Sequence, residues 1–328
     1  MVITLLVKFY FSFVLSKFML RSSWPKKLCS HYMTWTAYNL AKTVTQLGGG
    51  MALLSLLGLY YYQNSLIYPA SLNDGHGYCA TPDEYDIPYE AVKLTTSDGE
   101  TLQCYSMKQD CKSPNYTNKT ILMLSPNAGN IGHSLPIASI FYKKFGYNVF
   151  IYSYRGYGQS TGAPSEIGLK KDADTVVEYL TKDDDQYQQS SIVLYGRSLG
   201  GAVAIYIAAT KSASIDGMVL ENTFLSIRKT VPHIFPVLKY ITSFVHQKWD
   251  LELLVPSISE KLPVLLLSAR KDEIVPPEHM DLIYNLLPSN CKKMVEFENS
   301  FHNDTVLQES YWDTIHKFIK DNVNPVGM

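Results

Sequence analysis

Short apolar runs alternate with amphipathic segments from about residue 85 to the C-terminus. Continuous apolar runs of this length predict buried strands, and apolar positions spaced by three and four residues predict helices. Strands are expected at residues 90–96, 102–107, 120–124, 147–152, 191–195, 217–220, 263–267 and 293–297. Helices are expected at residues 135–145, 166–180, 202–209, 278–287 and 311–319. The alternation predicts an α/β fold with a mostly parallel sheet and helices on both faces, and the first two strands should form an antiparallel edge hairpin.

One stretch, residues 225–256, interrupts this alternation. It is rich in apolar and aromatic residues and lies between two predicted strands, where a simple crossover helix would need fewer residues. We interpret it as a small helical cap over the carboxyl edge of the sheet, where reactive groups gather in such folds. Additional core packing explains the composition equally well.

The N-terminal part of the chain contains two apolar runs. Residues 1–20 are interrupted by Lys8 and Lys17, whereas residues 43–62 carry no charge and end in three tyrosines. About 20 uncharged residues match the ~30 Å hydrocarbon thickness of a bilayer, and aromatic residues concentrate at its interfaces. We therefore expect a basic segment at 1–42, a transmembrane signal anchor at 43–68, and a catalytic domain at 85–322. A buried core helix is the alternative for the second run.

Charge around that run predicts an orientation. No Asp or Glu occurs before Asp74, and no Lys or Arg occurs between Lys42 and Lys93. Because positive flanks stay in the cytosol, the N-terminus should be cytosolic and the catalytic domain lumenal or extracellular, in the endoplasmic reticulum or another secretory-pathway membrane. An acid-free basic start is also typical of organelle transit regions, so a mitochondrial membrane is the alternative.

Two N-glycosylation sequons fall in a polar loop, at Asn115 and Asn118. They would be acceptors only if this loop is lumenal. A third match, at Asn303, is expected to stay unmodified because it adjoins the candidate catalytic base described below.

Composition narrows the function classes. The 328 residues carry a formal net charge of −1, so there is no basic excess of the kind that nucleic-acid binding requires. The five cysteines are scattered and form no CxxC pair, so neither a zinc site nor a disulfide scaffold is predicted. No metal and no organic cofactor is implied.

Candidate chemistry begins directly after the predicted strand at 191–195. Residues 196–200 read Gly-Arg-Ser-Leu-Gly, which is the G-x-S-x-G pattern of a nucleophile elbow. Small residues are needed there because the strand turns sharply into a helix and lifts the hydroxyl of Ser198 above the sheet. The apolar strand before it and the alanine-rich helix after it support this interpretation.

A serine hydroxyl needs a base, and the base needs an orienting acid. His302 follows the last predicted strand, and Asp272 follows the strand at 263–267. The chain order Ser198, Asp272, His302 is that of α/β-hydrolases. Glu273 is the fallback for the acid, whereas His279 is expected to be a surface residue at the start of a helix.

Stabilisation of the reaction's oxyanion requires backbone N–H donors. One should be Leu199, the residue after the nucleophile. The second should come from the loop after the strand at 120–124. Pro126 has no N–H, so Asn127 is the preferred donor and Ala128 the second choice.

Several segments together resemble a known family. Residues 85–319 are similar to α/β-hydrolases, and more narrowly to the membrane-anchored subfamily of α/β-hydrolase domain-containing protein 13 and its fungal bud-emergence (Bem46-like) relatives. The resemblance lies in residues 127–133, 154–158, 196–202, 221–226 and 302–305. It implies the same Ser198, Asp272 and His302 triad and an N-terminal membrane segment. This chain departs from the pattern at Ser125-Pro126, where His-Gly is usual, and at Ser134, where relatives tend to carry Arg.

The motif at residues 154–158, Tyr-Arg-Gly-Tyr-Gly, is interpreted as structural support for the site. The combined prediction is a membrane-anchored serine hydrolase that cleaves acyl esters or thioesters: a lipid esterase or an acyl-protein thioesterase such as a palmitoyl-protein hydrolase. Its expected partners are the lipid bilayer and an acyl-lipid or acylated-protein substrate. A non-catalytic membrane adaptor that retains the fold is the alternative.

Overall fold

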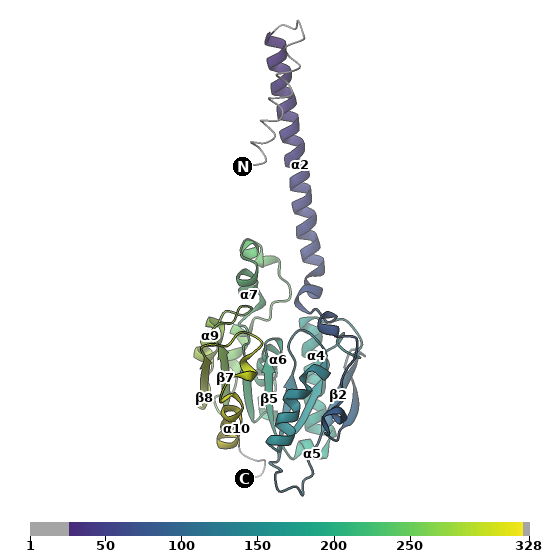
Figure 1. Ribbon diagram of the computed structural model, residues 1–328, viewed down its shortest axis with the longest axis vertical. Coiled ribbons are helices and arrows are strands. Elements are labelled where there is room, and N and C mark those ends of the chain that lie inside the picture. Colours follow the sequence, from purple (N-terminus) through teal and green to yellow (C-terminus); the bar gives the residue numbers. More distant parts are fainter. Residues whose placement is uncertain (1–25, 324–328) are drawn as a thin grey trace. The chain divides into compact units, whose positions relative to one another are not determined.

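The computed structural model describes residues 26–323 (Figure 1), so the apolar run at residues 1–20 lies outside the described residues. The chain divides into two compact units, residues 1–61 and 62–328. In the first unit the described structure is a single helix, and the second unit contains the sheet.

Helix α2, Lys26–Ile67, is long and apolar enough to cross a membrane. It passes the predicted boundary at residue 42 without a break, so the end of the basic segment continues into the apolar run as one helix. The helix ends at Ile67. The next residue, Tyr68, precedes Pro69, and a residue before proline disfavours the helical conformation.

The second unit is built on one eight-stranded sheet with the order β1-β2-β4-β3-β5-β6-β7-β8. The pairs β1–β2 and β2–β4 are antiparallel and all the others are parallel, which confirms the predicted α/β-hydrolase architecture with an antiparallel edge. The strands are β1 Glu90–Thr95, β2 Thr101–Met107, β3 Lys119–Leu124, β4 Asn148–Tyr152, β5 Ser191–Arg197, β6 Gly217–Glu221, β7 Val264–Ala269 and β8 Lys292–Phe297.

Helices cover both faces of the sheet because its central strands are apolar on both sides. Leu194 belongs to the cluster beneath α4 and α6, and its neighbour Val193 belongs to the cluster beneath α10. The α-helices are α3 Leu135–Ser139, α4 Glu166–Glu178, α5 Asp185–Gln188, α6 Leu199–Thr210, α7 Ile227–Ile234, α8 Leu251–Leu254, α9 Glu278–Leu286 and α10 Tyr311–Asn322; α3 and α4 continue as the π-helical turns Ile140–Lys144 and Tyr179–Asp183. Short 3-10 turns are Leu72–Asp74, Pro82–Tyr85, Ile131–Ser134, Ser212–Ser214, Pro236–Tyr240, Thr242–Phe244, Val255–Ser257 and Thr305–Leu307.

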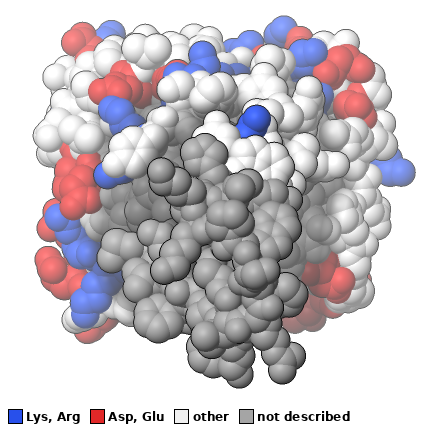
Figure 2. All heavy atoms as spheres, turned by 90° about the horizontal axis from the view of Figure 1, so that it is seen from above, with Lys and Arg blue, Asp and Glu red and all other residues white. Residues whose placement is uncertain are grey.

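The segment predicted as a cap has buried ends and an exposed middle. Its two ends are core, since Leu225, Trp249 and Leu251 are buried. Its middle, α7 and the 3-10 turns after it, stands out from the body of the second unit (Figure 1). Charged side chains of both signs are interspersed around the rim of the face shown in Figure 2.

Candidate active site

The turn from β5 into α6 holds Ser198 in a conformation that few L-residues adopt, with φ of 52° and ψ of −115°. The surrounding backbone is too close for larger residues. A Cβ on Gly196 would lie 2.4 Å from the carbonyl oxygen of Gly200, and one on Gly200 would lie 1.9 Å from that of Leu124. Close packing of β3, β5 and α6 therefore explains why glycine flanks the serine.

Strand β6 secures this strained residue. The Ser198 N–H donates to the Glu221 carbonyl oxygen at 2.9 Å, and the Ser198 carbonyl oxygen accepts from the Thr223 hydroxyl at 2.8 Å. Both backbone groups of Ser198 are thus fixed, and its conformation is set by its neighbours rather than by its own preference.

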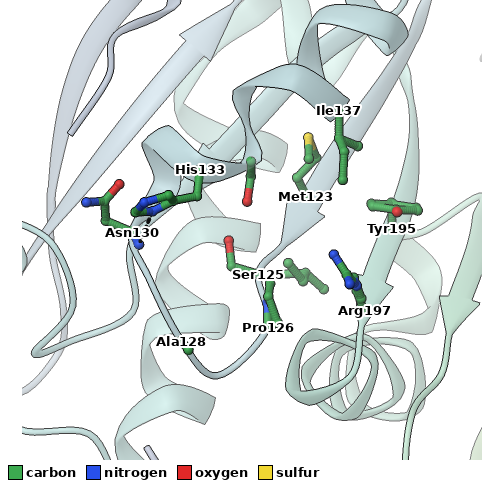
Figure 3. Close-up of a pocket in the computed structure, with 11 residues that line it drawn as sticks. Met123, Ser125, Pro126, Ala128, Asn130, His133, Ile137, Tyr195 and Arg197 are labelled. Atoms are coloured by element: carbon green, nitrogen blue, oxygen red, sulfur yellow. Dashed lines mark hydrogen bonds between the residues drawn. The ribbon is translucent and has the colours of Figure 1, made fainter. Parts of the chain in front are cut away.

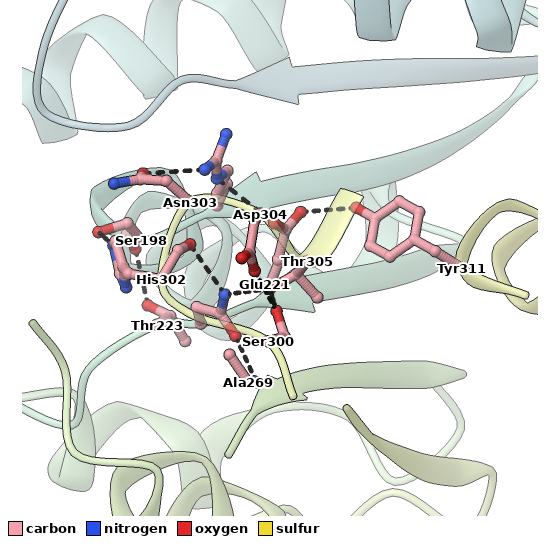
Figure 4. Close-up of polar contacts among 12 residues, drawn as sticks. Ser198, Glu221, Thr223, Ala269, Ser300, His302, Asn303, Asp304, Thr305 and Tyr311 are labelled. Carbon is pink, nitrogen blue, oxygen red and sulfur yellow. Dashed lines mark hydrogen bonds and ion pairs between the residues drawn. The ribbon is translucent and has the colours of Figure 1, made fainter. Parts of the chain in front are cut away.

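The structure brings the three predicted residues into one hydrogen-bonded chain. Figure 4 shows Ser198 and His302 of this chain. His302 Nε2 lies 3.1 Å from Ser198 Oγ, and His302 Nδ1 lies 2.7 Å from Asp272 Oδ2. All three side chains are more than nine-tenths buried. They follow β5, β7 and β8, whose carboxyl ends meet at the same edge of the parallel sheet.

Asp272 is itself oriented by the chain that follows it. Its Oδ1 accepts the N–H groups of Ile274 at 2.9 Å and Val275 at 2.8 Å, which leaves Oδ2 for the imidazole. The ring nitrogens of His302 pair with Asp272 and Ser198, so the fallback acid, Glu273, has another role. It accepts the backbone N–H of His302 at 3.1 Å, and so it holds the loop that carries the histidine.

The predicted surface position of His279 is wrong. The side chain is buried, and its Nδ1 accepts the Leu225 N–H at 3.2 Å, because the base of the cap packs over the start of α9. Burial lowers the pKa of His279 to about 4, so the ring is neutral at pH 7. In the unfolded chain the ring ionises near its ordinary pKa of about 6.5, so acidification from there toward pH 4 weakens the fold through this group.

Asn222 is a positioning residue to which the sequence analysis gave no role. It is buried with a φ of 46°, and its Oδ1 accepts the Ala269 N–H at 2.8 Å. Its Nδ2 donates to the His302 carbonyl oxygen at 3.0 Å and to the Thr305 hydroxyl at 2.7 Å. One side chain thus joins the end of β6 to the loops that carry the acid and the base. The available signals were its place directly after a buried strand at the reactive edge and its position in segment 221–226, which carries part of the family resemblance.

A buried carboxylate, Glu221, lies next to the elbow (Figure 4). Its Oε2 accepts the hydroxyls of Tyr195 at 2.7 Å and Tyr311 at 2.6 Å, and its Oε1 lies 3.4 Å from Arg197 Nε. Burial raises the pKa of both tyrosines, which keeps them protonated as donors. Arg197 in turn donates to Asn303 Oδ1 at 2.9 Å. This hydrogen bond joins the residue before Ser198 to the residue after His302.

We expect Glu221→Gln to lower Tm by about 5–10 °C, because it removes a buried charge and leaves the Arg197 guanidinium without its counter-ion. Thermal unfolding of the detergent-solubilised full chain measures this. Glu252→Gln is the matched control: Glu252 is half-exposed and pairs with Lys229 at 2.6 Å, so its loss should shift Tm by only about 1–2 °C. Equal shifts for the two variants would contradict a structural role for the buried group.

The loop after β3 is braced from beneath by the motif at residues 154–158. Tyr154 donates to the Ser125 carbonyl oxygen at 3.0 Å, and Tyr157 donates to the Asn127 carbonyl oxygen at 2.9 Å. These bonds bear out the prediction that the motif supports the site. Among the described residues, the N–H groups of Asn127, Ala128 and Leu199 have no protein acceptor.

A cavity of about 100 Å³ lies between this loop and the end of β5 (Figure 3). Ser125, Tyr195 and Arg197 are among its lining residues, but Ser198 is not. Within the described part of the chain, Ser125 Oγ is buried without a hydrogen-bond partner, and Arg197 Nε has only its 3.4 Å ion pair with Glu221. The cavity is therefore polar enough to hold water. Nowhere in residues 26–323 do three or more His, Cys, Asp or Glu side chains gather as metal ligands would.

Comparison with known proteins places this site in a family. The "Uncharacterized membrane protein YNL320W" of Saccharomyces cerevisiae is 50% identical over 275 residues, covering 83% of this chain and 95% of that protein. The "Protein bem46" of Schizosaccharomyces pombe is 43% identical over 287 residues, covering 87% and 95%. The chain belongs to the Bem46-like family of α/β-hydrolases.

Two broader matches agree with this family. Residues 129–261 match the family model described as serine aminopeptidase, S33. The Pyrococcus furiosus esterase Pf2001 superposes with a TM-score of 0.62 at 21% identity, covering 75% of this chain and 97% of the esterase. At that identity the match shows the fold alone, which for Bem46-like proteins is the α/β-hydrolase fold.

Proposed function

We propose that this Bem46-like protein is a membrane-anchored serine hydrolase that cleaves acyl ester or thioester bonds. The observation that carries the proposal is the hydrogen-bonded chain from Ser198 through His302 to Asp272 at a strained elbow. A strained, nearly buried serine facing a histidine is costly to maintain and is typical of a nucleophile.

In the proposed reaction, Ser198 Oγ attacks the acyl carbonyl carbon while His302 Nε2 takes the hydroxyl proton. The resulting imidazolium, stabilised by Asp272, donates that proton to the departing alkoxide or thiolate. Water then attacks the acyl-enzyme by the same route and releases the free acid and Ser198. The N–H groups of Leu199 and of Asn127 or Ala128 would receive the oxyanion, and each such donor is typically worth roughly 10²–10³ in rate.

The proposed substrate is an acyl-lipid or an acylated protein at the membrane. Helix α2 is a candidate membrane span, and the yeast relative with 50% identity is named a membrane protein. An anchor of this kind raises the effective concentration of bilayer-borne substrates around the active site. A lipid esterase and an acyl-protein thioesterase, including one that acts on palmitoyl-protein, use the same acyl-enzyme chemistry.

The charge pattern supports a topology in which the N-terminus is cytosolic and the catalytic domain is lumenal, in the endoplasmic reticulum or another secretory membrane. Asn115 is exposed, whereas the Asn118 side chain accepts from Tyr116 and donates to the Gln189 carbonyl oxygen. In that topology Asn115 is the acceptor that a glycan would disturb least.

We therefore expect endoglycosidase to increase the gel mobility of the protein isolated from cells, and Asn115→Gln to abolish most of that change. Asn303→Gln is the control and should leave the mobility change intact. A protein that migrates identically before and after the enzyme would argue against a lumenal domain.

The proposed activity is tested with the purified full chain in vesicles, using a series of acyl esters and acyl thioesters of increasing chain length. Turnover should rise with chain length and depend on Ser198. Comparative lipidomics and acyl-proteomics of cells carrying wild type or Ser198→Ala would then identify the accumulating substrate. A folded protein that turns over no acyl ester or thioester in the series would refute the proposal.

A further inference from the structure

The middle of the cap exposes a group of large apolar side chains. We call residues 234–244 the cap tip. Val237 and Tyr240 are 80% and 79% exposed, and neighbouring side chains are also largely accessible. Single exposed apolar residues are ordinary, but a cluster on a protruding segment marks an interaction surface. The exposed apolar residues of the cap tip are Ile234, Phe235, Val237, Tyr240 and Phe244.

The charged residues in the chain segment around the cap tip all have one sign. No Asp or Glu occurs between Glu221 and Asp250, and that interval contains Arg228, Lys229, Lys239 and Lys248. Lys239 and Lys248 are exposed, and Lys239 Nζ lies 4.8 Å from the centroid of the Tyr240 ring. Segments that lie in the interface of a bilayer typically contain aromatic and aliphatic side chains flanked by cations.

The base of the cap tip is tied to the end of α2, inside the second unit. Gln63 Oε1 accepts the His246 N–H at 2.8 Å, and Gln63 Nε2 donates to the Phe244 carbonyl oxygen at 3.4 Å. His246 Nε2 also lies 3.2 Å from Asn64 Oδ1. Gln63 directly follows the apolar run that ends at Tyr62. If the apolar run at residues 43–62 fills the hydrocarbon core of a bilayer, Gln63 lies at the edge of that core. The backbone at 244–246, which Gln63 contacts, then lies at the same level.

A buried cluster makes this connection rigid. Trp249 Nε1 donates to the Tyr68 hydroxyl at 2.7 Å, and that hydroxyl donates to Gln247 Oε1 at 3.1 Å. Tyr68, Gln247 and Trp249 are all buried. The chain leaving the candidate span and the chain returning from the cap tip are thus joined by both surface and core contacts.

We infer that the cap tip is a second membrane-contact surface, which inserts its apolar side chains into the boundary between headgroups and acyl chains of the bilayer that α2 crosses. Lys239 and Lys248 would face lipid phosphates. A bilayer fits better than a protein partner because the apolar residues form a protrusion rather than a groove, and because the flanking charge complements an anionic surface. The cap base packs on α9 beside the candidate active site, so a docked tip would place that site next to its lipid substrates.

The test uses the full chain reconstituted in vesicles of phosphatidylcholine and phosphatidylserine. A photo-reactive benzophenone amino acid is placed at position 237 in place of Val237, and in a separate protein at position 112 in place of Lys112. Lys112 is also exposed, but it precedes β3 and so lies toward the opposite edge of the sheet from the cap. Mass spectrometry of lipid adducts after illumination should show at least about tenfold more adduct at 237 than at 112.

A second pair of proteins tests the side chains that carry the inference. Phe235→Ser combined with Phe244→Ser should lower the adduct yield at 237 severalfold. Leu253→Ser should not, because Leu253 is 75% exposed but lies outside the cap tip. Equal yields at 237 and 112, or cross-links at 237 mainly to a second copy of the chain, would overturn the inference. Hydrolysis is not the readout, so this result stands independently of the proposed activity.

Discussion

Ser198→Ala should lower kcat for any acyl ester or thioester substrate by about 10⁴–10⁶-fold, because the acyl-enzyme can no longer form. The residual rate would come from the remaining oxyanion donors and from substrate binding. Steady-state kinetics of the full chain in vesicles measures this loss. The change removes one hydroxyl without altering the backbone that β6 holds, so Tm should stay within about 2 °C of wild type.

Ser212→Ala is the matched control for this prediction. Ser212 is exposed on the short turn after α6, and its replacement should leave kcat unchanged within about twofold. A Ser198→Ala protein that is folded and retains more than about 1% of wild-type kcat would show that another group is the nucleophile.

Asp272→Asn should lower kcat by about 10⁴-fold while the protein stays folded. The 2.7 Å contact between Asp272 Oδ2 and His302 Nδ1 fixes the tautomer that presents an acceptor to Ser198. An amide in that place favours the opposite tautomer and removes the charge that stabilises the imidazolium. Kinetics with a saturating substrate would report the change in kcat separately from KM.

The adjacent residue provides the control. Glu273 accepts the His302 backbone N–H, and a glutamine can still accept that hydrogen bond, so Glu273→Gln should cost less than about tenfold in kcat. If Glu273→Gln were as damaging as Asp272→Asn, the two carboxylates would share the role that the geometry gives to Asp272 alone.

The strands and the meeting of the three candidate catalytic residues could be predicted from the sequence because their signals are local. A short apolar run such as residues 192–195 predicts a buried strand, and parallel strands bring the residues that follow them to one edge. Asp272 and His302 follow β7 and β8 after short loops, which leaves little freedom in where they lie. The glycines around Ser198 are required by the close packing of β3, β5 and α6, and they are visible in the sequence alone.

Contacts between distant segments could not be predicted in the same way. Glu221 is charged, and charged residues are almost never fully buried without partners. Its burial depends on hydrogen bonds from Tyr195 and from Tyr311, which belongs to the last helix. No spacing in the sequence predicts that these three residues come together. The same limit explains His279, whose helix-start pattern is that of a surface position until the base of the cap packs over it.

The cap illustrates a different limit. Large apolar residues occur along its whole length, and composition alone does not separate residues that fill a core from residues that face outward. Trp249 and Phe235 are both large aromatic residues, yet Trp249 is fully buried and Phe235 is 56% exposed. Only the three-dimensional path of the chain distinguishes their roles, because Trp249 packs in the core beside Tyr68 whereas Phe235 lies in the exposed cap tip.

The most direct test of the proposed function is covalent labelling of the folded full chain with a fluorophosphonate, followed by peptide mass spectrometry to locate the adduct. A serine activated by His302 and Asp272 should react, the adduct should map to Ser198, and Ser198→Ala should abolish it. No labelling of the folded protein, or labelling at another serine that persists in Ser198→Ala, would contradict the account and favour a Bem46-like adaptor without catalytic activity.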